Sequence, residues 1–216
     1  MIYNARYNLN QNRKEILDYL KKEKEKNEKF SLIDIGSYGN PWSIDYIKAI
    51  LDIQDCKHGE VKFKGDMNLP YVWTDALNYV EQHGKFDFCV CTHTLEDITN
   101  PKLVCDMISK IAKEGFIAVP SKYAECHRSY SCEGPIRGTM HHRWIYNIEN
   151  NNFIGYPKLS FTEYLECCEQ LGQKYSDEKG ELSFFWKDSV NFNIVNNDFF
   201  PSSYFMRAVY ENLLNN

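Results

Sequence analysis

The chain has 216 residues and a mass of 25.5 kDa, close to the usual size of one domain. Hydrophobic residues make up 43% and charged residues 25%, which supplies enough apolar material for a core and excludes an intrinsically disordered chain. The formal net charge is -5, so the overall field attracts neither a phosphate backbone nor an anionic membrane. We therefore expect no nucleic-acid or membrane partner.

The first residues contain no apolar signal region, and no apolar run approaches the ~20 residues that cross a bilayer. These features predict a soluble cytoplasmic protein. The eight cysteines are scattered without CxxC spacing, so we interpret them as reduced thiols that mostly fill the core.

The first third of the chain alternates between helical and strand patterns. Residues 10–29 have apolar side chains at helical spacing. Residues 30–36 then form a strand pattern that ends in a turn containing Gly36 and Gly39. Pro41 suits the first turn of a helix over residues 42–51, whose end overlaps a short strand carrying Asp52.

The same alternation continues through the middle of the chain. Strands are predicted over residues 60–66, 85–91 and 115–120, and helices over residues 73–82 and 101–112. Strands that alternate with helices favour a parallel sheet covered on both faces. The predicted fold class is therefore α/β, with a doubly wound, mostly parallel sheet and helices on both faces.

The last part of the chain is less periodic. Residues 121–160 lack periodicity and are rich in His, Arg, Trp and Glu, which is typical of a lid or binding loop. Helices are predicted over residues 161–171 and 204–214, and strands over residues 181–187 and 190–195. We predict one domain over residues 1–216, divided into a cofactor-binding core (30–120), a substrate-side insertion or lid (121–160) and a part that completes the sheet (161–216).

Four landmarks in order over residues 30–120 resemble the class I S-adenosylmethionine-dependent methyltransferases, in particular the small-molecule branch with a Leu-Glu-His-like motif. They are Leu32-Ile-Asp34-Ile-Gly36-Ser37-Tyr-Gly39, the acid Asp52, Gly65-Asp66-Met67-Asn-Leu-Pro70, and the segment from Phe86 through Thr92-His93-Thr-Leu95-Glu96-Asp97. The resemblance implies a Rossmann-like methyltransferase fold that binds S-adenosylmethionine and releases S-adenosylhomocysteine (SAH).

The resemblance also implies roles for individual residues. Asp34, Gly36, Ser37 and Gly39 correspond to the turn that meets the cofactor's methionine part, and Asp52 to the acid that accepts from the ribose hydroxyls, with Asp55 as the alternative. Asp66 and Met67 correspond to the adenine contacts, and Thr92 and His93 to the end of the fourth strand, between cofactor and substrate.

The segment after the fifth predicted strand supplies the candidate catalytic residues. It lies at the end of the sheet where open α/β folds bind ligands, and it contains Glu125, His141, His142 and Arg143. Methyl transfer to a hydroxyl requires a base, a task that suits histidine near neutral pH. We expect His141 or His142 to be that base, Glu96, Glu125 and His93 to orient the acceptor, and Arg143 to bind an anionic or polyhydroxyl group.

A second, fainter resemblance implies which class of molecule accepts the methyl group. The Glu after the fifth strand and the later His-His-Arg-Trp element are similar to methyltransferase-like proteins associated with surface glycans, which implies a carbohydrate acceptor and O-methylation. Tyr123 and Trp144 offer aromatic faces for such a sugar.

Other interpretations remain open at this point. A scaffold or cofactor-binding protein with the same fold, a nicotinamide- or nucleotide-sugar-dependent enzyme and a nucleic-acid methyltransferase are the alternatives. The sequence contains no standard metal motif, so no metal ligand is assigned. A zinc site would have to draw on Cys126, His127, Cys132, His141 and His142.

Overall fold

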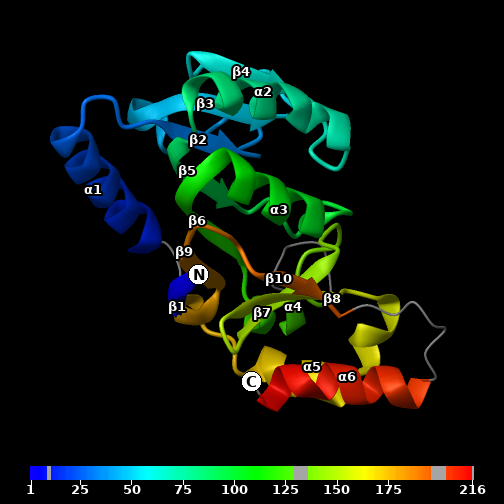
Figure 1. Ribbon diagram of the computed structural model, residues 1–216. Coiled ribbons are helices and arrows are strands. Elements are labelled where there is room, and N and C mark those ends of the chain that lie inside the picture. The colour runs from blue at the N-terminus through cyan, green and yellow to red at the C-terminus, as the bar shows by residue number, and fades with distance from the viewer. Residues whose placement is uncertain (9–10, 129–135, 196–202, 216) are drawn as a thin grey trace.

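A computed structural model describes residues 1–8, 11–128, 136–195 and 203–215. A seven-stranded sheet crosses the molecule, and a three-stranded sheet lies beside it (Figure 1). Among the helices in these ranges, none has both the length and the apolar character needed to cross a membrane.

The large sheet has the strand order β1-β9-β6-β5-β2-β3-β4. The bounds of these strands are β1 (Ile2–Asn8), β2 (Leu32–Ile35), β3 (Ile47–Asp52), β4 (Val61–Lys64), β5 (Phe86–Thr92), β6 (Ala112–Pro120) and β9 (Glu181–Lys187). Strands β4, β3, β2, β5 and β6 are parallel, and β9 is antiparallel to both β6 and β1. This arrangement confirms the predicted doubly wound, mostly parallel sheet, with its topological switch point between β2 and β5.

Helices cover both faces of this sheet. Helix α1 (Gln11–Lys26) places Ile16 and Leu20 on one face, against a cluster that includes Phe88 and Phe116. Helices α2 (Trp73–His83) and α3 (Pro101–Ile111) pack on the opposite face. Helix α3 begins where the sequence predicts, because Pro101 fits its first turn and the Asn100 side chain accepts a hydrogen bond from the Leu103 amide.

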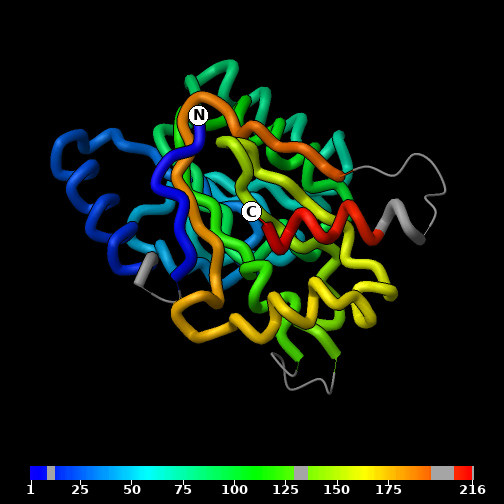
Figure 2. The backbone as a smooth tube through the Cα atoms, turned by 90° about the horizontal axis from the view of Figure 1, so that it is seen from below, coloured from blue at the N-terminus to red at the C-terminus, as the bar shows by residue number. Residues whose placement is uncertain are grey.

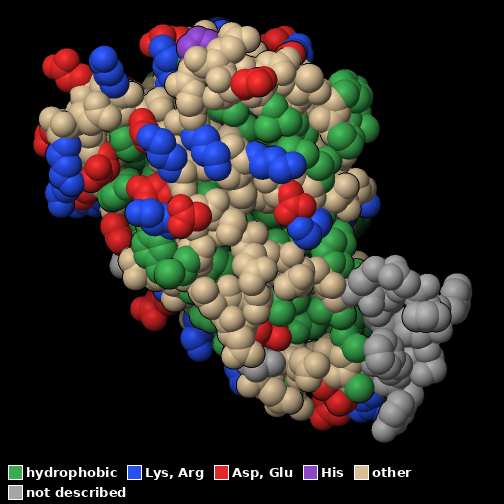
Figure 3. Space-filling model, in the orientation of Figure 1, with side chains coloured by type: hydrophobic (Ala, Val, Ile, Leu, Met, Phe, Trp, Pro, Cys, Tyr) green, Lys and Arg blue, Asp and Glu red, His purple; other side chains and the backbone are tan. Residues whose placement is uncertain are grey.

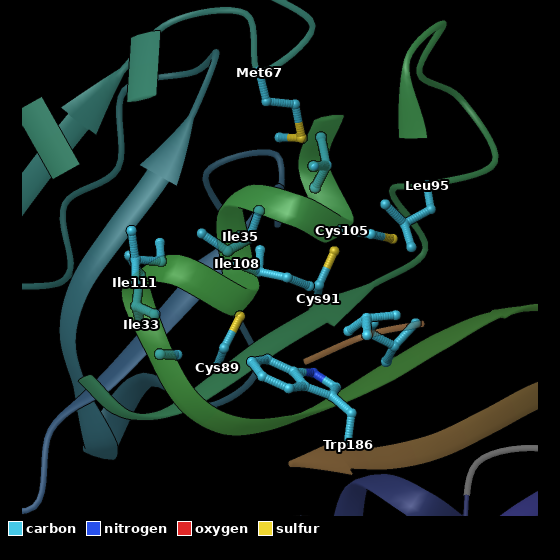
Figure 4. Packing of buried hydrophobic residues seen from close by; sticks show 14 of the residues in the cluster. Ile33, Ile35, Met67, Cys89, Cys91, Leu95, Cys105, Ile108, Ile111 and Trp186 are labelled. Atoms are coloured by element: carbon cyan, nitrogen blue, oxygen red, sulfur yellow. The ribbon is translucent and has the colours of Figure 1, made fainter. Parts of the chain in front are cut away.

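The largest core cluster lies between the large sheet and helices α2 and α3, and it continues into the small sheet. Alternate residues of β2 and β5 turn toward α3, and Trp186 of β9 packs beside Cys89 (Figure 4). The seven cysteines in the described ranges are all free and buried, so they fill the core as expected.

The described part of residues 121–160 contains regular secondary structure, although its sequence lacks periodicity. After the short helix α4 (Lys122–Cys126), strands β7 (Trp144–Glu149) and β8 (Asn152–Pro157) form a hairpin, and β10 (Phe192–Ile194) joins β8 in parallel. Asn150 and Asn151 connect the hairpin with φ of 48° and 63°, the left-handed conformation that asparagine tolerates. Helices α5 (Glu166–Gln173) and α6 (Ser203–Asn215) lie alongside each other below this small sheet (Figures 1 and 2).

Two predicted helices are wrong in part. Residues 42–51 form only a 3-10 turn at Ile44–Tyr46 before β3 begins at Ile47, because pairing with both β2 and β4 overrides the helical spacing of the isoleucines. Residues 161–171 divide into a 3-10 helix (Ser160–Tyr164) and the start of α5. Strand β1 is an element that the sequence analysis did not predict.

Candidate active site

The carboxyl ends of β2, β3, β4 and β5 meet at one edge of the sheet, which includes the switch point between β2 and β5. Each of these strands is followed by a segment that the sequence analysis selected. The parallel order therefore gathers the predicted cofactor residues at this edge.

The turn after β2 requires glycine because of its backbone conformation and because of a neighbouring side chain of the same chain. Gly36 and Gly39 have φ of 74° and 73°, and Tyr38 between them has φ of 54°. A side chain at Gly36 would meet Thr94, whose Oγ1 would lie 2.7 Å from the new carbon. The Thr94 hydroxyl also donates to the Gly36 carbonyl at 2.9 Å. The space beside Gly36 is thus filled by the chain itself.

Asp34 lies inside the protein at the end of β2, with 2% of its surface exposed. Burial raises the pKa of this carboxyl to about 7, and the hydroxyls of Ser37 and Ser43 oppose the rise. Ser43 Oγ donates to Oδ2 at 3.2 Å, whereas the buried Ser37 Oγ makes no hydrogen bond of acceptable geometry among the described residues. Among the described residues, Asp34 is therefore a buried acid without a cationic partner.

Asp52 fastens the glycine turn to the end of β3. Its Oδ2 accepts from the Gly39 amide at 3.2 Å and its Oδ1 accepts from the Gln54 amide at 2.8 Å. With 2% of its surface exposed, Asp52 faces the backbone of the turn. Asp55, the alternative acid, points outward and pairs with Lys64 at 2.8 Å.

Asp66 and Met67 follow β4 and differ in environment. Asp66 is partly exposed and its Oδ1 accepts from the amide and the side chain of Asn68 at 2.9 and 2.8 Å. Met67 is buried in the core, where its carbonyl accepts from Trp73 Nε1 at 2.9 Å. Only Asp66 of the two presents a side chain toward solvent.

A network of polar side chains follows β5. The Thr92 hydroxyl accepts from Trp42 Nε1 at 3.1 Å. His93 has φ of 50° and places Nε2 at 2.7 Å from Glu181 Oε2 and Nδ1 at 3.5 Å from Glu96 Oε1. Burial opposes the charged imidazole, but the two carboxylates outweigh it and raise the pKa of His93 to about 10.

Glu96 is the most enclosed member of this network, with 1% of its surface exposed. Burial raises the pKa of its carboxyl, and His93 partly offsets the rise. Its Oε2 is buried without a hydrogen-bond partner among the described residues. A buried oxygen of this kind marks a position where a proton, a water molecule or a ligand completes the site.

Glu125 and His142 form the tightest pair of the region. Glu125 Oε1 lies 2.5 Å from His142 Nδ1, and Glu125 Oε2 accepts from Lys158 Nζ at 2.7 Å. The side chain of Glu125 is fully buried, and those of His142 and Lys158 are nearly so. Burial lowers the pKa of His142, but the neighbouring Glu125, Glu96 and Asp97 outweigh it, and the net pKa is raised.

Strand β7 holds the histidines beside the end of β5. The Arg143 amide donates to the Glu96 carbonyl at 2.7 Å, and Trp144 Nε1 donates to the Ile98 carbonyl at 2.7 Å. An open cavity of about 520 Å³ is lined here by His141, His142, Arg143, Trp144 and Lys158, among others. The structure therefore brings together His141, His142, Glu96, Glu125, Arg143 and Trp144.

Other selected residues lie elsewhere. Tyr123 packs edge-on against Tyr7 of β1, with ring centroids 5.1 Å apart, and does not line this cavity. Cys126 is buried in the core below the small sheet, and His127 Nδ1 bonds to the Gly172 carbonyl at 3.0 Å. Cys132 lies outside the described residues. The zinc arrangement that would use Cys126 and His127 is thus not assembled.

The sequence analysis missed three polar residues of the site. Lys158 follows β8, Glu181 opens β9, and Asp97 follows the recognised Glu96. Lys158 and Glu181 come from strands distant in sequence, so no local pattern points to them. Asp97 is the last residue of the motif that contains Glu96. Its role in the site could not be predicted, because the sequence does not show that His141 and His142 lie next to it.

Comparisons with known proteins find structural similarity at low sequence identity. No family model and no curated protein matches the sequence. Solved structures that do match include the N-terminal domain of EvdMO1 with SAH bound (TM-score 0.38, 11% identity, 83% of this chain and 82% of that one). A cyclopropane-fatty-acyl-phospholipid synthase-like protein from Lactobacillus casei ATCC 334 also matches, with a TM-score of 0.37 and 11% identity over 85% of this chain and 96% of that one. The small RNA methyltransferase HEN1 matches at 0.38 and 11% identity over 81% of this chain and 25% of its own.

Proposed function

We propose that the protein is an S-adenosylmethionine-dependent methyltransferase that methylates a hydroxyl of a small molecule, namely a sugar or a glycan precursor. The observation that carries this proposal is the position of the Glu125–His142 pair. It stands beside the end of β5, next to the edge where Asp34, Asp52 and Asp66 gather. A candidate base thus adjoins a candidate donor site.

The donor side requires a movement of the glycine turn. Asp52 is covered by the Gly39 amide, so ribose hydroxyls reach this carboxylate when the turn lifts and they replace the amide as its partner. Ile53 and Leu69 follow the acids of β3 and β4 and are 53% and 39% exposed. Apolar side chains of this kind suit the faces of a purine ring.

On the acceptor side, Glu125 fixes the orientation of the His142 ring by binding Nδ1. Nε2 is then the nitrogen that accepts the proton of the acceptor hydroxyl while the oxygen attacks the methyl group in line. Glu96 and His93, which lie 3.5 Å apart, are expected to orient the acceptor from beside this pair, and His141 lines the cavity with His142. Arg143 and Trp144 offer a cation and a ring face to a polyhydroxyl acceptor.

Calorimetric titration with S-adenosylmethionine and with SAH tests the donor site. We expect micromolar binding of both, weakened at least tenfold by Asp52→Asn and unchanged by Asp55→Asn, the matched control on the exposed side of the same turn. Equal binding by the two variants would remove Asp52 from the donor site.

Turnover tests the acceptor side, with a panel of monosaccharides and oligosaccharides and mass detection of the methylated product. His142→Ala is expected to leave SAH binding intact and to slow turnover about 10²- to 10⁴-fold. His83→Ala serves as the control, because His83 lies at the exposed end of α2. An unchanged rate in His142→Ala would show that the base is another group.

A catalytically inactive binding or scaffold protein is the second candidate, and the enclosure of Asp34 and Asp52 favours it. Both acids already have intramolecular partners, and the space beside Gly36 is filled by Thr94. Tight SAH binding without turnover on any acceptor would support this alternative.

A further inference from the structure

Two imidazole nitrogens and one carboxylate oxygen converge at the mouth of the cavity. His141 Nε2 lies 3.5 Å from Asp97 Oδ1, and His142 Nε2 lies 3.8 Å from the same oxygen. All three atoms lie within 4.8 Å of one another. We propose that Asp97, His141 and His142 bind a divalent transition-metal ion of the Zn²⁺ class, a site that goes beyond the proposed methyl transfer and does not depend on it.

The spacing of the three atoms suits a metal ion. A tetrahedral zinc ion with bonds of about 2.0–2.1 Å holds its ligand atoms roughly 3.3–3.4 Å apart. Asp97 Oδ1 is 3.5 and 3.8 Å from the two nitrogens, so these two distances need to shorten by a few tenths of an ångström, and the two nitrogens start within 4.8 Å of each other. The side chains of Asp97 and His141 are 43% and 63% exposed, so a rearrangement at the surface is enough to close the distances.

The chain also fixes the orientation of one ligand. Glu125 occupies His142 Nδ1 at 2.5 Å, so the ring directs Nε2 toward Asp97. A carboxylate behind the distal nitrogen is the usual support of a metal-bound histidine. Lys158, at 2.7 Å from Glu125, balances the buried carboxylate, and Asp97 then supplies the negative charge that faces the cation.

The backbone assembles the ligands from two distant segments. Asp97 belongs to the loop after β5, and the histidines precede β7. The bond from the Arg143 amide to Glu96 and the bond from Arg143 Nε to the Asp97 carbonyl, 3.2 Å long, join the two segments. The site is therefore attached to the large sheet on one side and to the hairpin on the other.

Three protein ligands leave a coordination position open. Both histidines line the cavity, so a small molecule in it has access to that position. Open sites with three protein ligands are typical of catalytic metal ions, which bind a hydroxyl and acidify it. With the ion bound, His142 Nε2 is a ligand and no longer a base, so the ion and the proton compete for one nitrogen.

The test uses the full chain after treatment with a chelator. Titration with Co²⁺, followed by visible absorption, and calorimetric titration with Zn²⁺ are expected to give one site per chain with a dissociation constant at or below the micromolar range. His141→Ala and Asp97→Asn are expected to weaken binding at least tenfold. Both side chains lie on the surface, so these variants are expected to fold, as circular dichroism would verify.

Two further variants sharpen the outcome. Glu125→Gln is expected to weaken metal binding about 10- to 100-fold through loss of the carboxylate behind His142. His83→Ala, at the exposed end of α2, is expected to bind as the unmodified chain does. Absence of micromolar binding, or binding unaffected by His141→Ala and Asp97→Asn, would overturn the proposal. Neither donor nor acceptor is present, so the result is independent of the proposed methyl transfer.

Discussion

The site depends on charged side chains that are buried together with specific partners. Glu125 has His142 on one oxygen and Lys158 on the other, and His93 lies between Glu96 and Glu181. Asp34 differs from these residues because only hydroxyls oppose the cost of its burial. Partners from segments distant in the sequence stabilise these charges inside the protein, so substitution of such a residue is expected to change the stability.

Asp34 makes the stability of the protein depend on pH. Its pKa of about 7 in the folded chain lies above the ordinary value of 3.8, so between these values the folded state holds a proton that the unfolded state releases. The free energy of unfolding must then fall as the pH rises from about 4 to about 7. Asp34→Asn removes this pH dependence. The free energy of unfolding of the variant, relative to that of the parent, is therefore expected to rise by roughly 2–4 kcal/mol from pH 4 to pH 7.

Urea unfolding of both proteins at pH 5 and pH 8 checks this expectation, because other titrating groups contribute equally to the two chains. Parallel stability curves would mean that Asp34 ionises normally in the folded state.

Lys158 is expected to matter for stability through Glu125. Lys158→Met leaves that carboxylate buried without its ammonium partner, which costs about 3–5 kcal/mol in comparable buried pairs. Lys102→Met is the control, because Lys102 pairs with Asp106 on the exposed face of α3 and its loss costs no more than ~0.5 kcal/mol. Chemical denaturation gives both values, and similar losses in the two variants would contradict the importance of the buried pair.

At the scale of the elements, the sequence predicts the parallel core and misses what surrounds it. Strands β2, β5 and β6 and helices α2 and α3 have clear local patterns. The hairpin β7–β8 lacks clean alternation, since Ile145, Tyr146 and Asn147 are all buried between two layers. The Asn150-Asn151 turn was the available signal. Lys158, which follows β8, and Glu181, which begins β9, could not be predicted as site residues without knowledge of how the strands pair.

Strand β6 offers a prediction at this scale. A side chain at Gly115 would stand 2.8 Å from Trp186 Nε1 of β9 and would collide with the Cys89 carbonyl of β5. Gly115→Ala is therefore expected to lower the free energy of unfolding by roughly 2–3 kcal/mol, because neighbouring strands on both sides must move.

Gly84→Ala is the control for this substitution. Gly84 has φ of 83° and ψ of 165°, a conformation that is essentially restricted to glycine, but nothing lies within 4 Å of the added carbon, so its cost of about 1–3 kcal/mol comes from the backbone alone. A loss below ~1 kcal/mol at Gly115 would show that β6 and β9 separate more easily than their packing implies.

At the scale of the whole molecule, the large sheet and the small sheet meet beside the edge formed by the carboxyl ends of β2 to β5. The large sheet supplies the acids of the donor side, and the small sheet with α5 and α6 carries His142 and Lys158 to it. On the face shown in Figure 3, basic and acidic side chains lie among each other. A ligand bound between the units is expected to stabilise both.

This coupling gives a prediction for the intact protein. A ligand that binds only the folded state at one hundred times its dissociation constant adds about 2.7 kcal/mol to the free energy of unfolding, which raises the melting temperature of a chain this size by roughly 5–10 °C. We expect SAH to produce this shift, and Asp52→Asn to reduce it at the same SAH concentration because the ribose loses its acceptor. NAD should leave the melting temperature unchanged, since Tyr38 occupies a position in the turn where the dinucleotide fingerprint requires glycine. A shift with NAD but none with SAH would place the protein among nicotinamide-dependent enzymes, whereas a shift with neither would leave the doubly wound sheet as a scaffold for the histidine site.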